Sequence, residues 1–282
     1  MVVVKKPNEL THARHDPAHC LAPGLFRSLK RGERKKQKLD ITYSYGEGES
    51  ARFVGFEPLG ADDMRILQGL VALAGPEGLI LTPEPQSDMA RQLRLFLEPK
   101  FDAEEKDGLI VRERMTKLLA EIGLTNTGDN IKNLKASLLR MSNVTILATK
   151  GTRQASFHLL SYDFDSSDGR LFVALNPRIA EAVLGRRSYA RIELAEVRRL
   201  QTDPARLIHQ RLSAWIDPSK SRQVELDTLC EYVWHDPTDN PNTMKTRRQS
   251  VRKGLAELAV VGWIVDEYAR GKFEISRPAV QR

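Results

Sequence analysis

Hydrophobic residues recur at two different periods along this chain, and the order of the two periods predicts its fold. Helical spacing, with apolar positions three and four residues apart, predicts helices over residues 62–74, 86–97, 111–122 and 131–141. Alternating apolar and polar positions then predict strands over 144–149, 154–162 and 170–175. Helices followed by a pair of strands are typical of a winged helix-turn-helix.

The same order of elements returns in the last third of the chain. Helices are predicted over 192–200, 204–216, 227–233 and 242–259, a short strand over 223–226, and a hairpin formed by 263–265 and 272–275. We therefore expect an α+β, mainly helical fold with tandem winged helix-turn-helix domains and small β-hairpin wings. The expected division is a flexible basic tail (1–50), a first domain for dimerisation and DNA backbone contact (51–190), and a second for principal recognition (191–282).

The helix predicted over 242–259 is the most informative segment for function. Met244, Val251, Leu255 and Leu258 fall on one side of it, and polar side chains fall on the other. Arg and Lys donate to guanine, Asn and Gln pair with adenine, and Thr contacts the thymine methyl group, so this helix is predicted to read DNA. The expected contacts are Asn242, Lys245, Thr246, Arg248, Gln249, Arg252 and Lys253.

Two further sets of residues are predicted to touch DNA. Arg270 and Lys272 lie in the hairpin after this helix, where a wing meets the phosphate backbone. The helix predicted over 131–141 presents Lys132, Asn133, Lys135 and Arg140 outward or at the flank. The alternative for the helix over 242–259 is an exposed, ion-rich helix without a ligand. The alternative for the helix over 131–141 is that its domain chiefly supports self-association.

Composition and charge support an anionic partner. Among 282 residues there are 44 Lys and Arg against 37 Asp and Glu, a formal charge of +7. The basic run from Arg27 to Lys38 could lie along phosphates or could be a solvated charge run. Short apolar stretches and two cysteines favour a cytoplasmic protein.

Enzyme motifs are missing from the sequence. There is no phosphate-binding G-x-x-x-x-G-K-[ST] loop and no His-x-His pair, so we expect no catalytic residue and no cofactor. His12, His15, His19 and Cys20 are close in sequence, but a chance grouping is favoured over a metal site, and no metal is expected. Asp163, Asp165 and Asp168 are interpreted as part of a hairpin turn and not as a calcium loop.

A short motif at residues 92–96, QLRLF, is similar to the peptides with which bacterial proteins bind the sliding clamp of DNA polymerase. Its candidate contacts are Gln92, Leu93, Leu95 and Phe96. The alternative is a core role, because Met89, Leu93, Phe96 and Leu97 also fit one buried helical face.

Long segments of the chain resemble the TrfA family, the iteron-binding replication initiators of broad-host-range plasmids. The resemblance lies in residues 1–20, in NIKNLKASLLRMSNVTILATKG (130–151) and in the segment from Thr243 to Pro278. It implies binding to directly repeated iterons at a plasmid origin, opening of an AT-rich region, and a monomer-dimer equilibrium that limits copy number. It also implies recruitment of host DnaA, the replicative helicase DnaB and the sliding clamp. The alternatives are a transcriptional repressor and an origin-nicking enzyme.

Overall fold

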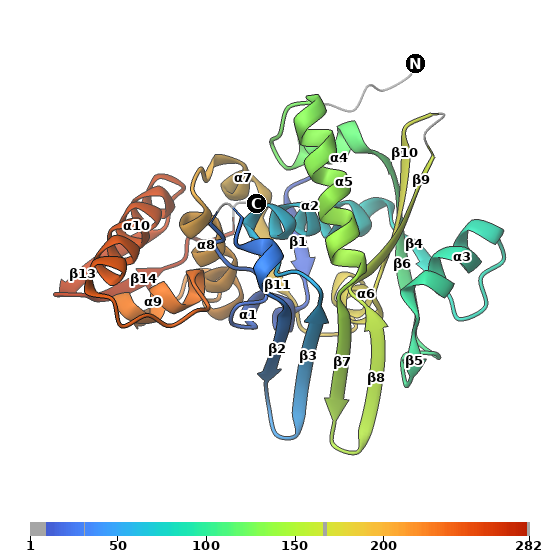
Figure 1. The fold of residues 1–282 in the computed structure, drawn as a ribbon, viewed down its shortest axis with the longest axis horizontal. Helices are drawn as coiled ribbons and strands as arrows, with labels where there is room; N and C mark the ends of the chain where they lie inside the picture. Colours follow the sequence, from blue (N-terminus) through green and yellow to red (C-terminus); the bar gives the residue numbers. More distant parts are fainter. Residues whose placement is uncertain (1–9, 31, 166–167, 281–282) are drawn as a thin grey trace.

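The computed structural model describes residues 10–30, 32–165 and 168–280. Within these ranges the chain forms ten α-helices, one short 3-10 helix and fourteen strands in four separate sheets (Figure 1). Every pairing between these strands is antiparallel. The expectation of a mainly helical fold with small hairpin wings is therefore wrong, because the sheets are major layers of an α+β fold.

The largest sheet has five strands in the order β2-β3-β7-β8-β5. Its strands are β2 (Leu39–Ser44), β3 (Glu49–Gly55), β7 (Thr145–Lys150), β8 (Arg153–His158) and β5 (Lys100–Phe101). The buried side chains of Ile41, Phe53, Ile146 and Phe157 stand opposite one another across four neighbouring strands. This apolar row fixes the register, since a shift by one residue would turn it toward solvent.

The second sheet has the order β4-β6-β10-β9 and is covered on both faces. It consists of β4 (Leu79–Leu81), β6 (Gly108–Arg114), β10 (Arg170–Leu175) and β9 (Leu160–Asp165). Leu109 and Val111 face the main core, while Ile110 joins a small cluster beneath α3 (Asp88–Leu97). Burial on both faces explains the unbroken apolar run, and it explains why the helix expected from 111 begins only at Met115.

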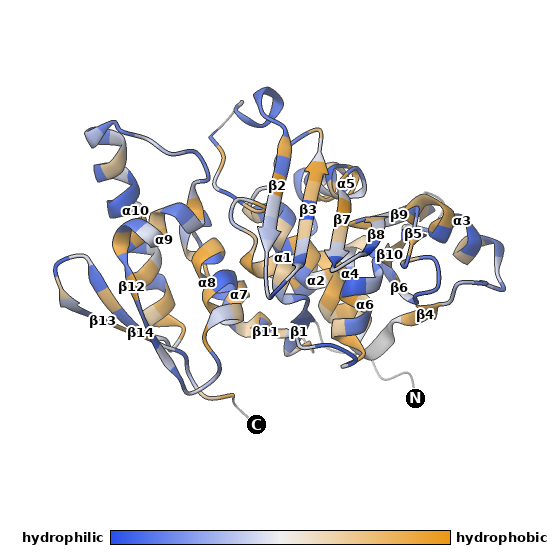
Figure 2. Cartoon of the chain, turned by 90° about the horizontal axis from the view of Figure 1, so that it is seen from below, coloured by the Kyte–Doolittle hydropathy of each residue, from blue (hydrophilic) through white to orange (hydrophobic). Residues whose placement is uncertain are grey.

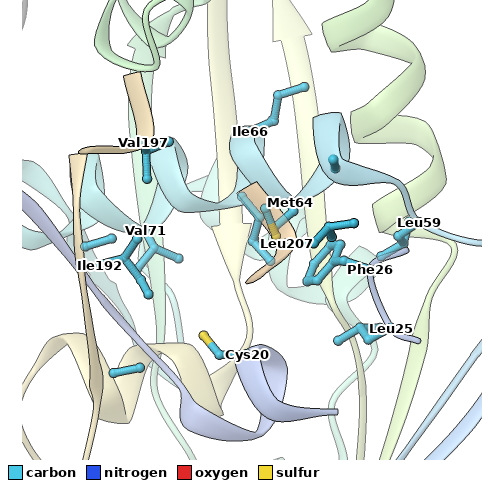
Figure 3. Packing of buried hydrophobic residues seen from close by; sticks show 14 of the residues in the cluster. Cys20, Leu25, Phe26, Leu59, Met64, Ile66, Val71, Ile192, Val197 and Leu207 are labelled. Atoms are coloured by element: carbon cyan, nitrogen blue, oxygen red, sulfur yellow. The ribbon is translucent and has the colours of Figure 1, made fainter. Parts of the chain in front are cut away.

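A long central helix, α2 (Ala61–Glu77), joins the sheets to the surrounding helices. Its predicted inward residues Met64, Leu67, Leu70, Val71 and Ala74 are all buried, but Ile66 and Leu73 on other sides are buried as well. Figure 3 shows Met64, Ile66 and Val71 of this helix among side chains from residues 20–26 and from residues 192–207. A helix that is apolar nearly all round belongs in the middle of a core.

The remaining helices around α2 are short, apart from one. They are α1 (Pro17–Leu21), α4 (Met115–Glu121), the longer α5 (Gly128–Ser142) and α6 (Pro177–Val183).

Residues 10–50 do not form the flexible tail that we expected. Strand β1 (His12–His15) pairs with β11 (Ala190–Glu193), and Ala13 and Ile192 are opposite each other and fully buried. Leu25 and Phe26 also lie in the core (Figure 3). The apolar residues that anchor this segment are few and widely spaced, which is why no periodicity revealed them. Residues 1–9 lie outside the described part of the chain.

The C-terminal elements follow the predicted order closely. They are α7 (Leu194–Arg199), α8 (Asp203–Trp215), α9 (Leu226–Val233), α10 (Pro241–Val260) and a three-stranded sheet β12-β14-β13. The sheet consists of β12 (Ser221–Glu225), β14 (Lys272–Ser276) and β13 (Ile264–Ala269). One continuous apolar cluster runs from Ala13 to Ile275, so this part shares the main core. The functional division at residue 191 stays a prediction.

Candidate nucleic-acid interface

Helix α10 is held by its N-terminal cap, by one apolar stripe and by a close approach to α8. The Asn240 carboxamide oxygen accepts from the backbone N–H groups of Asn242 and Thr243, at 3.0 and 3.1 Å, and Pro241 occupies the first turn. Val251, Leu255 and Leu258 are buried, as predicted, and Met244 is partly buried against the core. Gly254 lies against α8 so closely that an added Cβ would be 2.9 Å from the Ala205 backbone nitrogen. The helix is thus fixed in rotation about its axis.

This rotation turns a polar stripe toward solvent. Its members, which we call the outer face of α10, are all exposed: Asn242, Lys245, Thr246, Gln249 and Lys253. Lys245, Gln249 and Lys253 have no side-chain partner among the described residues, whereas Thr246 donates to the Asn242 carbonyl at 3.0 Å. No acidic residue occurs in α10 before Glu257. The outer face therefore has free donors and no competing carboxylate of its own. Figure 2 colours the beginning of α10 mostly hydrophilic.

The two predicted arginine contacts of α10 are already paired within the protein. Arg248 binds both carboxylate oxygens of Asp227 at 2.7 Å, and Arg252 binds Glu267 of β13, with one contact at 2.8 Å. The hydrogen bonds from Arg252 and from the Gly271 N–H lower the pKa of Glu267 to about 2. These bidentate pairs fix the orientation of both guanidinium groups at the edge of the outer face.

The hairpin residues lie beside this edge, as the sequence predicts. Arg270 and Lys272 are exposed on either side of Gly271, whose positive φ of 75° makes the turn. The Lys272 ammonium is 3.7 Å from a Glu225 carboxylate oxygen, a loose contact between two exposed groups. Both cations are available to a phosphate group.

The first-half candidates do not form one surface. Lys132, Asn133 and Lys135 of α5 are exposed, and the Lys135 ammonium lies 4.3 Å from the centre of the Phe164 ring. Arg140 instead binds the fully buried carboxylate of Asp63 at 2.7 Å, so its role is to hold α5 against α2. In Figures 1 and 2, α5 and α10 belong to well-separated parts of the molecule.

The motif at 92–96 is only partly accessible. It lies within α3, where Gln92 is exposed, Leu95 is 71% exposed and Phe96 is 50% exposed, but Leu93 is fully buried. The interpretation of Phe96 as a core residue is therefore wrong, while Leu93 and Leu97 do lie in the core. Leu95 and Phe96 line a shallow groove of about 710 Å³ with three prolines.

The motif analysis assigned no structural role to several cations outside the outer face of α10. The run 27–38, treated as a tail, is folded: Arg27 is buried and the Arg34 guanidinium donates to Asp63 at 2.8 Å. Arg247 covers the Trp234 ring, with 5.4 Å to its centre. A cluster of basic residues was the only sequence signal for this region. The described residues include no cluster suited to a metal ion and no helix that could cross a membrane.

A family model described as Replication protein C (RepC) matches residues 7–279 of the chain. The chain belongs to the RepC family. A RepC-family protein is a replication initiator, so the resemblance noted in the sequence holds at that level, although the family matched is RepC and not TrfA. No curated protein sequence gives a match.

Solved structures of RctB have a similar fold. Crystal structures of its domains 2 and 3 give TM-scores of 0.57 and 0.56 at 11% and 10% identity. The matches extend over 94% and 93% of this chain and over 99% and 97% of the two RctB chains. At such low identity the likeness concerns the fold alone.

Proposed function

We propose that this RepC-family initiator binds duplex DNA at the origin of its replicon by inserting the outer face of α10 into the major groove. The major groove is wide enough for an α-helix and displays a distinct donor and acceptor pattern for each base pair. The observation that carries the proposal is a solvent-facing row of Lys245, Gln249 and Lys253 without protein partners. Arg270 and Lys272 would bind the adjoining phosphates.

The test of this proposal is the affinity of single variants for the origin duplex and for a scrambled duplex. Lys253→Ala and Gln249→Ala are each expected to weaken origin binding by roughly 1–3 kcal/mol if the lost contact reads a base. Lys100→Ala is the matched control, because Lys100 is exposed on β5, at the far side of the molecule from α10 (Figure 1). Unchanged origin affinity in both α10 variants would remove this helix from recognition.

Binding directly repeated sites and opening a neighbouring AT-rich region are further parts of the proposal. Permanganate footprinting is the direct readout of opening, because it modifies unpaired thymines. Thymines beside the bound repeats should become reactive with the wild-type protein, in the presence or absence of DnaA. A fully protected duplex in both reactions would support a repressor instead. This activity needs no covalent chemistry and no cofactor.

Recruitment of the sliding clamp is proposed through the exposed part of α3, where Leu95 and Phe96 face solvent. Phe96→Ala is expected to weaken binding to purified clamp at least tenfold, since aromatic anchors dominate small interfaces. Leu79→Ala is the control, because Leu79 is also exposed but lies outside the motif. Equal clamp affinity of the two variants would contradict this assignment. Recruitment of DnaA and DnaB and self-association for copy control complete the proposal.

A further inference from the structure

A cleft of about 380 Å³ lies between residues 27–33 and the beginning of α10. Its walls come from two parts of the chain that are distant in sequence, the segment that contains Arg27 and Lys30 and residues 234–247. They include Arg27, Lys30, Trp234, Thr243, Thr246 and Arg247. Figure 2 places the hydrophilic loops that precede β2 and α10 on the same side of the molecule. Thr246 belongs both to this cleft and to the outer face of α10, so the two are continuous.

Arg27 is the buried cation of this cleft, and its counterion is distant. Its side chain is 5% exposed, and its backbone N–H donates to the Leu59 carbonyl at 3.0 Å, which fixes the segment. The guanidinium is 3.9 Å from Asp236 and 3.5 Å from the Lys38 carbonyl, and its Nε has no partner among the described residues. Burial lowers the pKa of Arg27, but a guanidinium stays charged at neutral pH. A buried charge with such distant partners is suited to an anionic ligand.

Arg247 supplies a second oriented guanidinium. It lies over the Trp234 ring and donates through Nη1 to the Asp236 carbonyl at 2.7 Å. The aromatic face and this single hydrogen bond hold the group flat, which leaves its other donors for a ligand. Asp236 precedes α10, so this hydrogen bond draws the Arg247 guanidinium toward the N-terminal side of the helix.

Lys30 is the exposed cation of the cleft. Its side chain is 80% exposed, and its ammonium is 4.0 Å from Glu33, a long contact. Glu33 and Asp236 are the two carboxylates of the cleft, against three cations. The resulting single positive charge matches one phosphodiester, which carries one negative charge, better than a multiply charged anion.

We propose that this cleft binds one phosphate of the DNA backbone and so holds the duplex beside the outer face of α10. The inference rests on the proposed function, because a duplex on the outer face would bring its backbone to Thr246. It assigns to the segment 27–30 a place in the interface that α10 alone does not provide. Phosphate contacts of this kind set the register of a reading helix without selecting sequence.

The experiment uses the full chain and a set of origin duplexes, each with one uncharged methylphosphonate at a successive position. For the wild-type protein, one position on the side of the cleft should weaken binding about three- to tenfold. Lys30→Gln should weaken binding to the unmodified duplex by a similar factor. The affinity of this variant should not change further when that methylphosphonate is present. The affinity of this variant should also depend less on salt, so that the slope of the logarithm of the binding constant against the logarithm of the salt concentration is smaller in magnitude by about 0.9.

Two more variants complete the design. Arg247→Ala should behave as Lys30→Gln does, and neither change removes a buried side chain that the fold requires. Lys150→Gln is the matched control, because its side chain is 79% exposed in the β7–β8 hairpin, and it should keep the wild-type pattern. If Lys30→Gln and Arg247→Ala keep the full sensitivity to every methylphosphonate, the cleft does not hold DNA and the proposal is overturned.

A separate titration identifies a different source of the phosphate. Inorganic phosphate at millimolar concentration is added to the DNA-free protein while the indole N–H signal of Trp234 is followed by NMR. A shift of that signal together with unchanged methylphosphonate patterns would mean that the cleft holds a free ion, which also overturns the proposal. Lys253→Ala on the same duplexes separates the proposed function from the cleft proposal. If this variant weakens origin binding while the cleft variants do not, the cleft proposal fails and DNA binding by α10 stands.

Discussion

The role of a side chain in this protein depends on the residue that it contacts, and that residue often comes from a distant part of the sequence. Arg140 and Arg252 look alike in the sequence, since both are arginines near the polar side of a predicted helix. Arg140 reaches a buried carboxylate of α2, whereas Arg252 stays at the surface with Glu267. The spacing that predicts the outer face of α10 holds no information about Asp63, so the role of Arg140 could not be predicted.

His15 gives the stability of the fold a pH dependence. Its side chain is fully buried, its ring nitrogens have no partner among the described residues, and burial lowers its pKa to about 3. Below pH 6.5 the unfolded chain binds a proton at this site and the folded chain does not, so acid favours unfolding. Between pH 7.5 and 5.5 this group alone should reduce the free energy of unfolding by about 1.4 kcal/mol.

Urea denaturation of wild type and of His15→Gln at these two pH values is the measurement. Burial also lowers the pKa of His12 and His235, so both proteins should lose stability in acid. Asp16, beside His15, has a lowered pKa and acts only at more acidic pH. The loss should be smaller in His15→Gln, and equal losses would mean that His15 titrates normally in the folded protein.

Helices and strands could be predicted from the sequence where one face is buried and the opposite face is exposed to solvent. Helix α10 extends one residue beyond each end of the predicted 242–259, because its apolar stripe repeats regularly and Asn240 and Pro241 mark its start. Strand β6 and helix α4 were merged into one helix, since Val111 and Met115 are both apolar and no glycine or proline separates them. Strands β1 and β2 went unseen because their burial depends on partners far along the chain.

The contact between α8 and α10 depends on a glycine. In most exposed helix positions Gly→Ala gains up to about 1 kcal/mol. At Gly254 the added methyl group would meet backbone atoms of Pro204 and Ala205 at 2.9–3.2 Å, so Gly254→Ala should instead destabilise the protein by roughly 1–3 kcal/mol.

The measurement is the Tm of Gly254→Ala and of Gly128→Ala, each compared with the Tm of the wild-type protein. Gly128 begins α5 and has open space around it, so the same substitution there should leave the Tm unchanged or slightly raised. A Tm for Gly254→Ala at or above the wild-type value would indicate that the two helices are less tightly packed than described.

At the scale of the molecule, the two predicted domains share one apolar core. The three tryptophans, Trp215, Trp234 and Trp263, all lie in the C-terminal part, so fluorescence reports that part and far-ultraviolet circular dichroism reports the whole chain. Because the core is continuous from Ala13 to Ile275, the two signals should give coincident urea transitions.

Removal of residues 1–16, which deletes β1, provides the second half of this test. Loss of the β1–β11 pairing should lower the midpoint of both signals together. Separate transitions in the intact protein, or a fluorescence midpoint insensitive to the deletion, would instead support two independent domains divided near residue 191.

The pairing of β1 with β11 also has a consequence for biosynthesis. Residues 12–15 leave the ribosome early, but their partners, residues 190–193, are translated only after about two-thirds of the 282 codons. Until then the first strand has an open edge, which is the kind of surface that nascent-chain chaperones shield. Completion of the fold is thereby postponed until α8 and α10, the last long helices of the chain, are about to emerge.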